Sequence, residues 1–110
     1  MMISSGSVGT PIGTPAGIAL NHNATVLYVC DSAANAVRRV ALANGAVTLV
    51  AGGNSAASVN GVGAAASFNG PADLVVDHAR NMLYVAESAG RRVRRIALAT
   101  NNVTTVATLR

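Results

Sequence analysis

The sequence predicts an all-β fold built from two copies of one unit, and three observations support this prediction. Residues 15–51 align with residues 71–107 without a gap, and 18 of the 37 aligned positions are identical. Each copy divides into segments of about four to seven residues that are rich in Val, Leu and Tyr. Residues that favour turns (Gly, Asn, Asp, Ser and Pro) separate these segments, which is typical of short strands joined by tight turns.

The strands are expected at equivalent places in the two copies. They are predicted at 17–21, 26–32, 37–42 and 46–51 in the first copy, and at 72–77, 82–87, 93–98 and 103–107 in the second. Asn44-Gly45 separates the last two segments of the first copy, and this pair favours a two-residue type I′ hairpin turn. Eight short antiparallel strands result.

The regions outside the strands are rich in small residues. Residues 53–70 form a Gly, Ala and Ser rich connector whose one large apolar residue, Phe68, is predicted to be a buried anchor. Residues 1–14 align with the end of this connector, Ile12 falling on Phe68, and are predicted to be a degenerate copy of it. The predicted organisation is therefore 1–14 connector, 15–52 first repeat, 53–70 connector and 71–110 second repeat.

Residues 31–44 also fit a helix. Asp31 or Ser32 would be its N-cap, Val37 and Val40 would share one face, and Asn44-Gly45 would end it. The second copy weakens this alternative, since a glycine and an asparagine replace two of the small residues that favour it. On periodicity and propensity alone, helix and strand remain about equally supported.

Four segments of the first copy resemble the NHL repeat. They are Pro-Ala-Gly-Ile-Ala-Leu (15–20), Leu-Tyr-Val-Cys-Asp-Ser (27–32), Val-Arg-Arg-Val (37–40) and Val-Thr-Leu-Val-Ala-Gly (47–52), and the connector at 59–71 is similar too. In that family each repeat is a four-stranded antiparallel blade, and six blades usually close into a propeller. The resemblance implies a strand at 37–40. It also implies two blades that remain an incomplete propeller unless the chain oligomerises or is part of a longer one.

The resemblance assigns structural roles to several repeat positions, which are Pro15, Tyr28, Asp31, Phe68, Pro71, Tyr84, Glu87 and Arg92. Asp31 and Glu87 occupy the family's acidic position at the end of the second strand. Arg92 matches the arginine that is expected to pair with this acid. The first copy has Ala36 at that place, so Asp31 is expected to lack its partner.

The arginines are the candidate contacts for nucleic acid or another polyanion, because guanidinium groups suit phosphate. The set consists of Arg38, Arg39, Arg91, Arg92, Arg94 and Arg95. Neighbouring strand residues point to opposite faces, so each Arg-Arg pair should divide across its blade. The alternative is that these side chains cover apolar faces or pair with Asp31 and Glu87. No aromatic residue is interleaved with them to stack bases, which favours the alternative.

Three further residues have structural interpretations. His22 and His78 are equivalent and are predicted to be turn residues, and Cys30 is predicted to be a small core residue. No catalytic residue, metal ligand or cofactor is predicted.

Composition limits the function classes. The chain has 110 residues and a formal charge of +4, but charged residues are only 11% of it. Neither a signal peptide nor a membrane-spanning run is visible, which favours an intracellular location. The leading prediction is a non-enzymatic binding or scaffold module for proteins, acting through residues 52–70 and the turns near His22 and His78. Binding of RNA or another polyanion is the alternative, and part of a propeller lyase is the third class. Predicted partners are a protein or further copies of the chain, three of which would complete six blades, and not a membrane.

Overall fold

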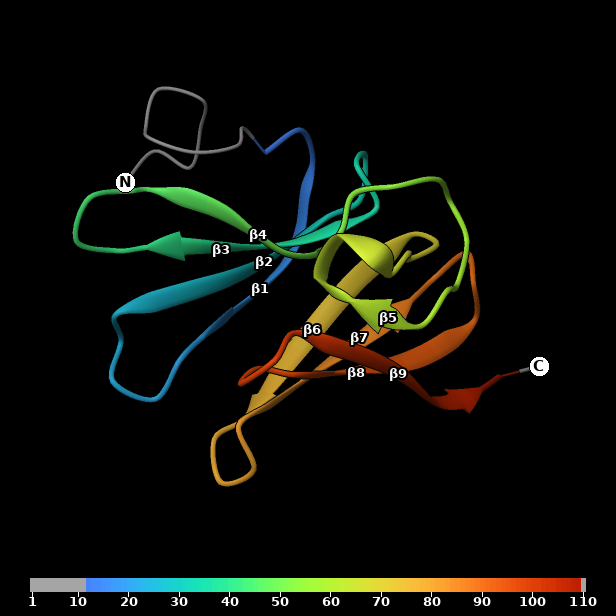
Figure 1. The fold of residues 1–110 in the computed structure, drawn as a ribbon. Helices are drawn as coiled ribbons and strands as arrows, with labels where there is room; N and C mark the ends of the chain where they lie inside the picture. The colour runs from blue at the N-terminus through green and yellow to red at the C-terminus, as the bar shows by residue number, and fades with distance from the viewer. Residues whose placement is uncertain (1–11, 110) are drawn as a thin grey trace.

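The computed structural model describes residues 12–109 and confirms an all-β fold of two antiparallel sheets (Figure 1). The first sheet, blade one, has the order β1-β2-β3-β4, with β1 at Pro15–Leu20, β2 at Val26–Asp31, β3 at Ala36–Ala41 and β4 at Val47–Gly52. The second, blade two, has the order β5-β9-β8-β7-β6, with β5 at Gly61–Val62, β6 at Pro71–Asp77, β7 at Met82–Glu87, β8 at Arg92–Ala97 and β9 at Asn102–Thr108. The segment 36–41 is strand β3, so the helix alternative is wrong.

The two blades repeat each other in strand register as well as in sequence. Tyr28 pairs with Arg39 in blade one, and Tyr84 pairs with Arg95 in blade two. Irregularities between Val37 and Arg38 and between Val93 and Arg94 fall at equivalent places. The 56-residue sequence repeat is therefore a structural repeat, down to its bulges.

One turn differs from the predicted form. The connection between β3 and β4 is closed by Ala41 N, which donates to Ala46 O at 2.9 Å, and Gly45 N donates to Ala41 O at 2.7 Å. A type I′ turn needs positive φ at both central residues, but of the pair Asn44-Gly45 only the glycine has one, 73°. The predicted two-residue turn is thus wrong, and a four-residue loop replaces it. Asn101, with φ of 60°, takes the same place in blade two.

The connector contains a strand that the sequence did not predict. Gly61 and Val62 pair with Val103 and Asn102, which adds β5 to the outer edge of blade two. A short 3-10 turn, Gly63–Ala65, follows it and contacts β4 of blade one. Phe68 is fully buried, as predicted. The connector therefore fills the space between the outer parts of the two blades (Figure 1).

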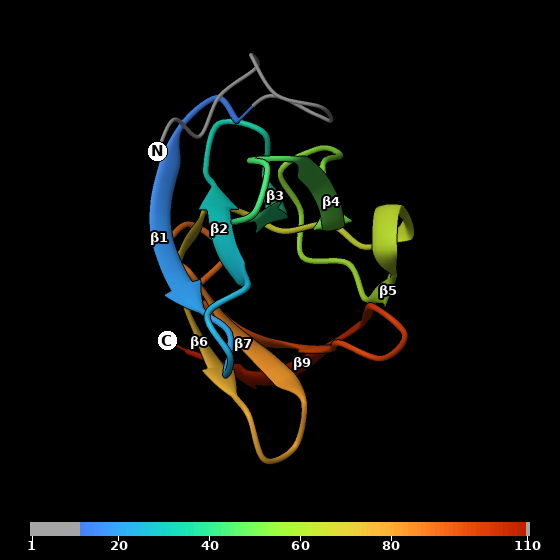
Figure 2. The same ribbon diagram turned by 90° about the vertical axis from the view of Figure 1, so that its left-hand side faces the viewer.

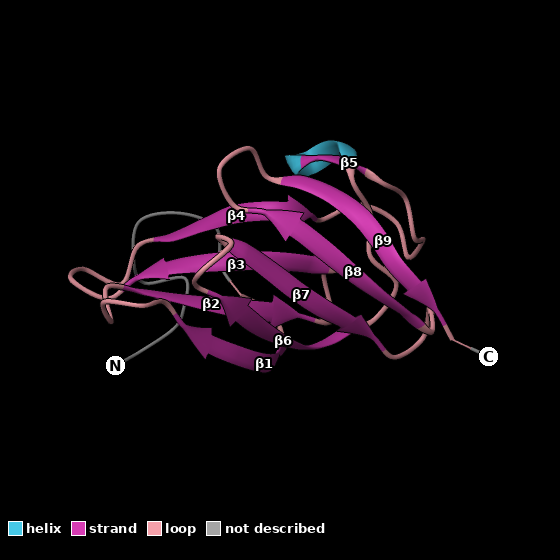
Figure 3. Ribbon diagram, turned by 90° about the horizontal axis from the view of Figure 1, so that it is seen from below, coloured by secondary structure: helices cyan, strands magenta, loops and turns pink. Residues whose placement is uncertain are grey.

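The blades pack face to face, with β1 and β6 at one side of the molecule and β4 and β9 at the other (Figures 2 and 3). Each blade has two faces because strand residues alternate. The forward face of blade one packs against the rear face of blade two, and both contribute to one hydrophobic core. The forward face comprises Ala19, Tyr28, Cys30, Val37 and Val50, and the rear face of blade two comprises Leu74, Val76, Leu83, Val85 and Ile96.

A second, smaller core lies on the rear face of blade one. Val29, Val40 and Val47 are buried there, with Ile12 and Leu27 packed against them. These positions are equivalent to Val85, Ile96, Val103, Phe68 and Leu83 of the main core. Ile12 thus takes the place of Phe68, as the alignment indicated, while the rest of the prediction for residues 1–14 lies largely outside the described residues. Within 12–109 there is no helix long and apolar enough to cross a membrane.

Candidate functional site

The acid at the end of β2 has an arginine partner after all. The buried Asp31 carboxylate accepts a hydrogen bond from Arg38 Nε at 3.2 Å, and the Arg38 side chain is also buried. Backbone N–H groups of Gly13 and Thr14 donate to the same carboxylate at 3.1 Å each, and Ala34 N donates at 3.3 Å. The expectation that Asp31 lacks its partner is therefore wrong, because Arg38, two residues beyond Ala36 on β3, makes the pair.

These contacts also set the protonation of Asp31. Burial acts to raise the pKa of this carboxyl, but the hydrogen bonds from Gly13, Thr14, Arg38 and Ala34 outweigh it and hold the pKa below its ordinary value. The carboxylate is therefore ionised at neutral pH, where it ties the segment before β1 to the end of β2.

Blade two uses the equivalent pair. Arg94 Nη1 donates to Glu87 Oε2 at 2.8 Å and to Ser67 O at 2.9 Å, and Nη2 donates to Asn60 Oδ1 at 3.0 Å. The guanidinium also lies 5.3 Å from the centre of the Phe68 ring, within the range of a cation–π contact. Arg94 thus holds the connector against blade two.

The pairing predicted for Arg92 is wrong. Its Nη1 donates to Ser58 Oγ at 3.2 Å and to Gly90 O at 3.1 Å, and Ser58 Oγ in turn donates to Glu87 Oε1 at 2.7 Å. Ser58 therefore stands between Arg92 and the acid, and Arg94, two residues further along β8, makes the direct ion pair.

This geometry divides the six candidate arginines. Each Arg-Arg pair does split across its blade, because Arg38 and Arg94 are buried whereas Arg39 and Arg95 are exposed. Arg91 is also exposed, and Arg92 is half-buried. The buried pair is engaged with carboxylates and cannot contact phosphate without leaving the core.

The turns that contain His22 and His78 come together at one end of the junction between the blades. Both residues lie in turns, as predicted, and their ring centres are 5.6 Å apart with the planes tilted by 60°. They line a hollow of about 260 Å³, which adjoins a second hollow of about 320 Å³. Tyr28, Asn81 and Leu98 line both hollows, so we treat them as one feature, the crevice.

The crevice is lined mainly by amide, imidazole and hydroxyl groups. Its residues are Asn21, His22, Asn23, Tyr28, Arg39, Thr48, Leu49, Val50, Val76, His78, Asn81, Leu98 and Asn101. Asn21 holds its own turn, since its Oδ1 accepts from the N–H groups of Thr25 and Val26, each at 2.9 Å. Arg39 supplies a positive charge. Such a set can donate and accept hydrogen bonds along a polar ligand, with apolar side chains beneath it.

Sequence reasoning pointed to the turns of this site but missed most of its lining. His22 and His78 belong to different repeats, so the sequence predicts two turn residues and does not indicate that they lie together. The 56-residue equivalence was the available signal, since equivalent turns of stacked repeats fall at the same end of the structure.

Some crevice residues that come from blade one have counterparts in blade two. Tyr84, Arg95, Thr104 and Val106 stand where Tyr28, Arg39, Thr48 and Val50 stand in blade one. Here Arg95 and Val106 are exposed and Tyr84 is half-buried, since nothing in residues 12–109 covers them.

Cys30 belongs to the core and not to a reactive site. Burial, with a smaller effect from the charge of Asp73, raises the pKa of its thiol to about 12, so the nucleophilic thiolate is not formed at neutral pH. Across the described part of the chain, no three His, Cys, Asp or Glu side chains are grouped so that they could hold a metal ion.

The sequence is similar to two curated proteins. It is 34% identical over 102 residues to NHL repeat-containing protein 2 of Bos taurus and, by the same measures, to that of Homo sapiens. The match covers 84% of this chain but 14% of each relative, so the chain spans about a seventh of their length. No model of a known protein family matches the chain.

Solved structures share the fold. A Bacteroides thetaiotaomicron protein of unknown function has a TM-score of 0.70 at 25% identity, over 78% of this chain and 22% of that one. An auxiliary nutrient binding protein from the same bacterium has a TM-score of 0.71 at 18% identity, over 89% and 28%. A luciferin-regenerating enzyme has a TM-score of 0.65 at 17% identity, over 90% and 31%. At these coverages the chain corresponds to a part of each larger structure.

Proposed function

We propose that this chain, whose two repeats belong to the NHL-repeat family, is a binding module that takes a polar, acidic segment of another protein in the crevice. The crevice is the observation that carries the proposal. It is built from equivalent turns of both blades, and it combines hydrogen-bonding side chains with one exposed positive charge.

The lining suits an extended peptide. Amide groups such as those of Asn23 and Asn81 can donate to and accept from a peptide backbone, as can the imidazoles of His22 and His78. Arg39 can bind a carboxylate with two parallel hydrogen bonds. The hollows, of about 260 and 320 Å³, have room for a few side chains. Acidic residues in the ligand are therefore favoured over basic ones.

Nucleic-acid binding is less well supported. Of the six candidate arginines, Arg38 and Arg94 are engaged in buried ion pairs. Two of those that remain exposed are far apart, since Arg39 lines the crevice while Arg91 lies in the turn between β7 and β8, at the opposite end of the strands.

Catalysis is also not part of the proposal. The luciferin-regenerating enzyme shares the fold at 17% identity, and this likeness concerns the fold alone. The described residues of this chain that line the crevice include histidines but no carboxylate to act with them. A binding role requires only that the side chains lining the crevice form hydrogen bonds and a charged contact with a ligand.

The test compares two exposed arginines at opposite ends of the molecule. Peptides of random sequence would be selected on the immobilised chain, and their affinity would be measured for Arg39→Ala and for the control Arg91→Ala. We expect Arg39→Ala to weaken binding about tenfold, the loss of one charge-assisted contact, and Arg91→Ala to leave it unchanged.

An oligouridylate of 15 nucleotides serves as the competing probe. If it binds with steep salt dependence and is weakened equally by Arg39→Ala, Arg91→Ala and Arg95→Ala, the chain is a polyanion binder and the proposal is wrong. The proposal is also wrong if selected peptides bind Arg39→Ala and His78→Ala as tightly as the parent chain.

A further inference from the structure

The exposed apolar residues of the blades are not scattered. Val75 on β6 is 60% exposed and Ile18 on β1 is 57% exposed, and Leu20 and Val106 are also exposed. The equivalent of each in the other blade is Ala19, Leu74, Val76 and Val50. All four of these belong to the core between the blades or pack against it, and Leu74 is only 4% exposed.

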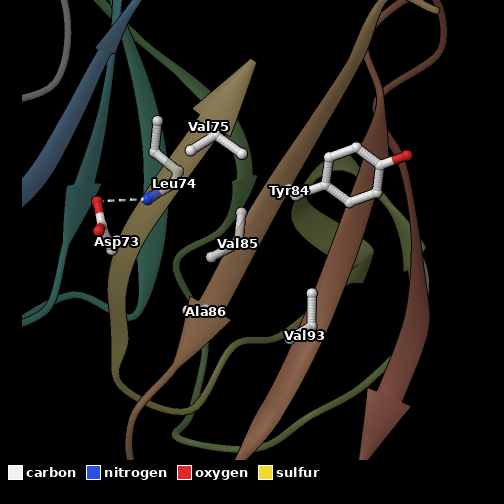
Figure 4. Close-up of a pocket in the computed structure, with 7 residues that line it drawn as sticks. All are labelled: Asp73, Leu74, Val75, Tyr84, Val85, Ala86 and Val93. Atoms are coloured by element: carbon white, nitrogen blue, oxygen red, sulfur yellow. Dashed lines mark hydrogen bonds between the residues drawn. The ribbon is translucent and has the colours of Figure 1, made fainter. Parts of the chain in front are cut away.

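The exposed residues therefore belong to two surfaces, and the equivalent of each surface in the other blade is buried in the junction between the blades. Val75, Tyr84, Ala86, Val93 and Val106 make the forward face of blade two, which repeats the forward face of blade one. Most of this face lies side by side on β6, β7 and β8 around a shallow hollow of about 190 Å³ (Figure 4). Ile18, Leu20 and Leu27 lie on the rear face of blade one, which repeats the rear face of blade two. Within one chain, a forward face is covered by a rear face.

We propose that the forward face of blade two binds the rear face of blade one of a second copy of this chain, in a head-to-tail junction that reproduces the junction between the two blades. The two surfaces come from the same pair of contacting faces, so their shapes match by descent from one repeat. Such a contact is heterologous, because the two copies contribute different surfaces. Each junction leaves one forward and one rear face free for further copies.

A second copy of the chain is the partner expected for the forward face of blade two, because the repeat positions match and not only because the face is apolar. Tyr84 and Val93 stand where Tyr28 and Val37 are buried by blade two, so the surface that fits them is one with the pattern of Leu74, Val76 and Leu83. In the described chain, the surface with that pattern is Ile18, Leu20 and Leu27, of which Ile18 and Leu20 are exposed and Leu27 is half-buried. A contact between two forward faces would bring like surfaces together and would leave Ile18 and Leu20 uncovered.

One position distinguishes the new junction from the existing one. A Cβ atom on Gly17 would lie 2.7 Å from Asp73 Cα and 2.8 Å from Ala72 O, so β1 and β6 approach closely because Gly17 has no side chain. The residue equivalent to Gly17 in blade two is Asp73, which has both a Cβ and a charge. The junction between copies must therefore be looser at the inner strands, and its association correspondingly weaker than the contact within one chain.

The experiment measures the mass of the 110-residue chain by light scattering on a sizing column, over about a hundredfold range of concentration. The parent chain is expected to rise above the mass of one chain with concentration. Val75→Arg damages the forward face of blade two, and Ile18→Arg damages the rear face of blade one. Each alone is expected to weaken association about tenfold or more, because the junction would bury an unpaired charge. Val59→Arg is the control, an exposed valine of the connector that lies on neither face and is expected to change nothing.

Mixing the two variants tests the head-to-tail geometry. Val75→Arg keeps an intact rear face and Ile18→Arg keeps an intact forward face, so an equimolar mixture can form one junction and should stop at two chains. Asp73→Gly, which restores the residue found at position 17, is expected to strengthen association of the otherwise unchanged chain. Circular dichroism melting would establish that each variant is folded.

Several results would overturn the proposal. A parent chain that stays monomeric at every concentration would show that the forward face is left for a different partner. Association that Ile18→Arg does not weaken would exclude the head-to-tail arrangement, as would a mixture that remains monomeric. None of these residues lines the crevice, so these results are independent of the peptide-binding test.

Discussion

At the scale of single residues, the two acid–arginine pairs have the same place in the fold but different surroundings. Asp31 keeps three backbone N–H donors besides Arg38. Glu87 accepts from one backbone N–H, that of Asn69, and from Ser58 and Arg94. Arg94 also has no exposed surface and holds Ser67 and Asn60 of the connector. The pair in blade two therefore depends more on its arginine.

Removal of Arg94 should accordingly be the more damaging change. Arg94→Ala leaves Glu87 as a buried charge without its main partner, and we expect a loss of about 3–5 kcal/mol in the free energy of unfolding. Arg38→Ala should cost about half as much, because backbone donors still hold Asp31. Urea unfolding would measure both, with the exposed Arg95→Ala as the control. Equal costs for Arg38 and Arg94 would contradict this account.

The lowered pKa of Asp31 makes the molecule sensitive to acid. A carboxyl whose pKa is lower in the folded state stabilises the fold at pH values above its unfolded pKa of about 3.9. This contribution is lost as the pH falls below that value and through the folded-state pKa. We expect the urea midpoint of the parent chain to fall between about pH 5 and pH 2, and that of Asp31→Asn to change less over the same range.

The titration can be followed directly if Asp31→Asn does not fold. The carboxyl carbon of Asp31 in the parent chain should show an NMR titration midpoint below that of a free aspartate. A midpoint at or above the free value would mean that burial, and not the four hydrogen bonds, dominates its surroundings.

At the scale of elements, the connector is shaped by its entry from β4. Gly52 has a φ of 84°, and a Cβ atom there would lie 2.5 Å from Asn35 O and 2.7 Å from Phe68 Cδ2. Gly53 has nearly the same φ, 86°, but its Cβ would be no closer than 3.7 Å to Leu49. The two adjacent glycines thus share the same backbone conformation, and only Gly52 lies in close contact with Phe68.

This contrast provides a matched pair of substitutions. Gly53→Ala should cost about 1 kcal/mol for the left-handed backbone alone. Gly52→Ala should cost at least about 2 kcal/mol more, because Phe68 or the Asn35 carbonyl must move within a close-packed core. Thermal unfolding of both variants would measure the difference. Similar melting temperatures would mean that Phe68 is not held as tightly as the structure indicates.

The strands themselves were predictable because their signals are local. Short segments rich in Val, Leu and Tyr, with bounding turn residues, placed most strands of the repeats within two residues of their observed ends. The strand at 37–42 was implied only by the family resemblance, because local signals fitted a helix equally well. The isolation of Phe68 in a run of small residues identified the anchor. Strand β5 was not predictable in this way. It has two residues, and its pairing with β9 about 40 residues later depends on how the connector folds back across blade two.

The candidate site was predictable only in part, for a similar reason. Arg92 does not reach Glu87 directly, because Ser58 of the connector lies between the two side chains and is hydrogen-bonded to both. Which arginine pairs with Glu87 therefore depends on where the connector lies. The crevice requires knowledge that the turns of His22 and His78 are stacked in space. Neither fact is encoded in the spacing of residues within one repeat.

At the scale of the whole molecule, the two blades form one body and not two independent units. The main core takes residues from both blades and from the connector, and Gly70 N donates to Asn35 Oδ1 at 3.0 Å across the junction. If the blades separated, the apolar residues that they bury against each other would be exposed to water. This fold thus depends on the junction between the two blades. The forward face of blade two and the rear face of blade one are the surfaces on which further copies would bind.

The crevice has a consequence for binding strength once such junctions are repeated. Its histidines come one from each blade, and blade two already presents His78, Tyr84 and Arg95 on the side where a further blade would lie. Every head-to-tail junction would therefore bring another His78 beside another His22. A row of chains would offer one such groove for each pair of neighbouring blades. A partner with repeated acidic segments could then be held by several weak contacts at once, with an avidity far above the affinity of any single groove.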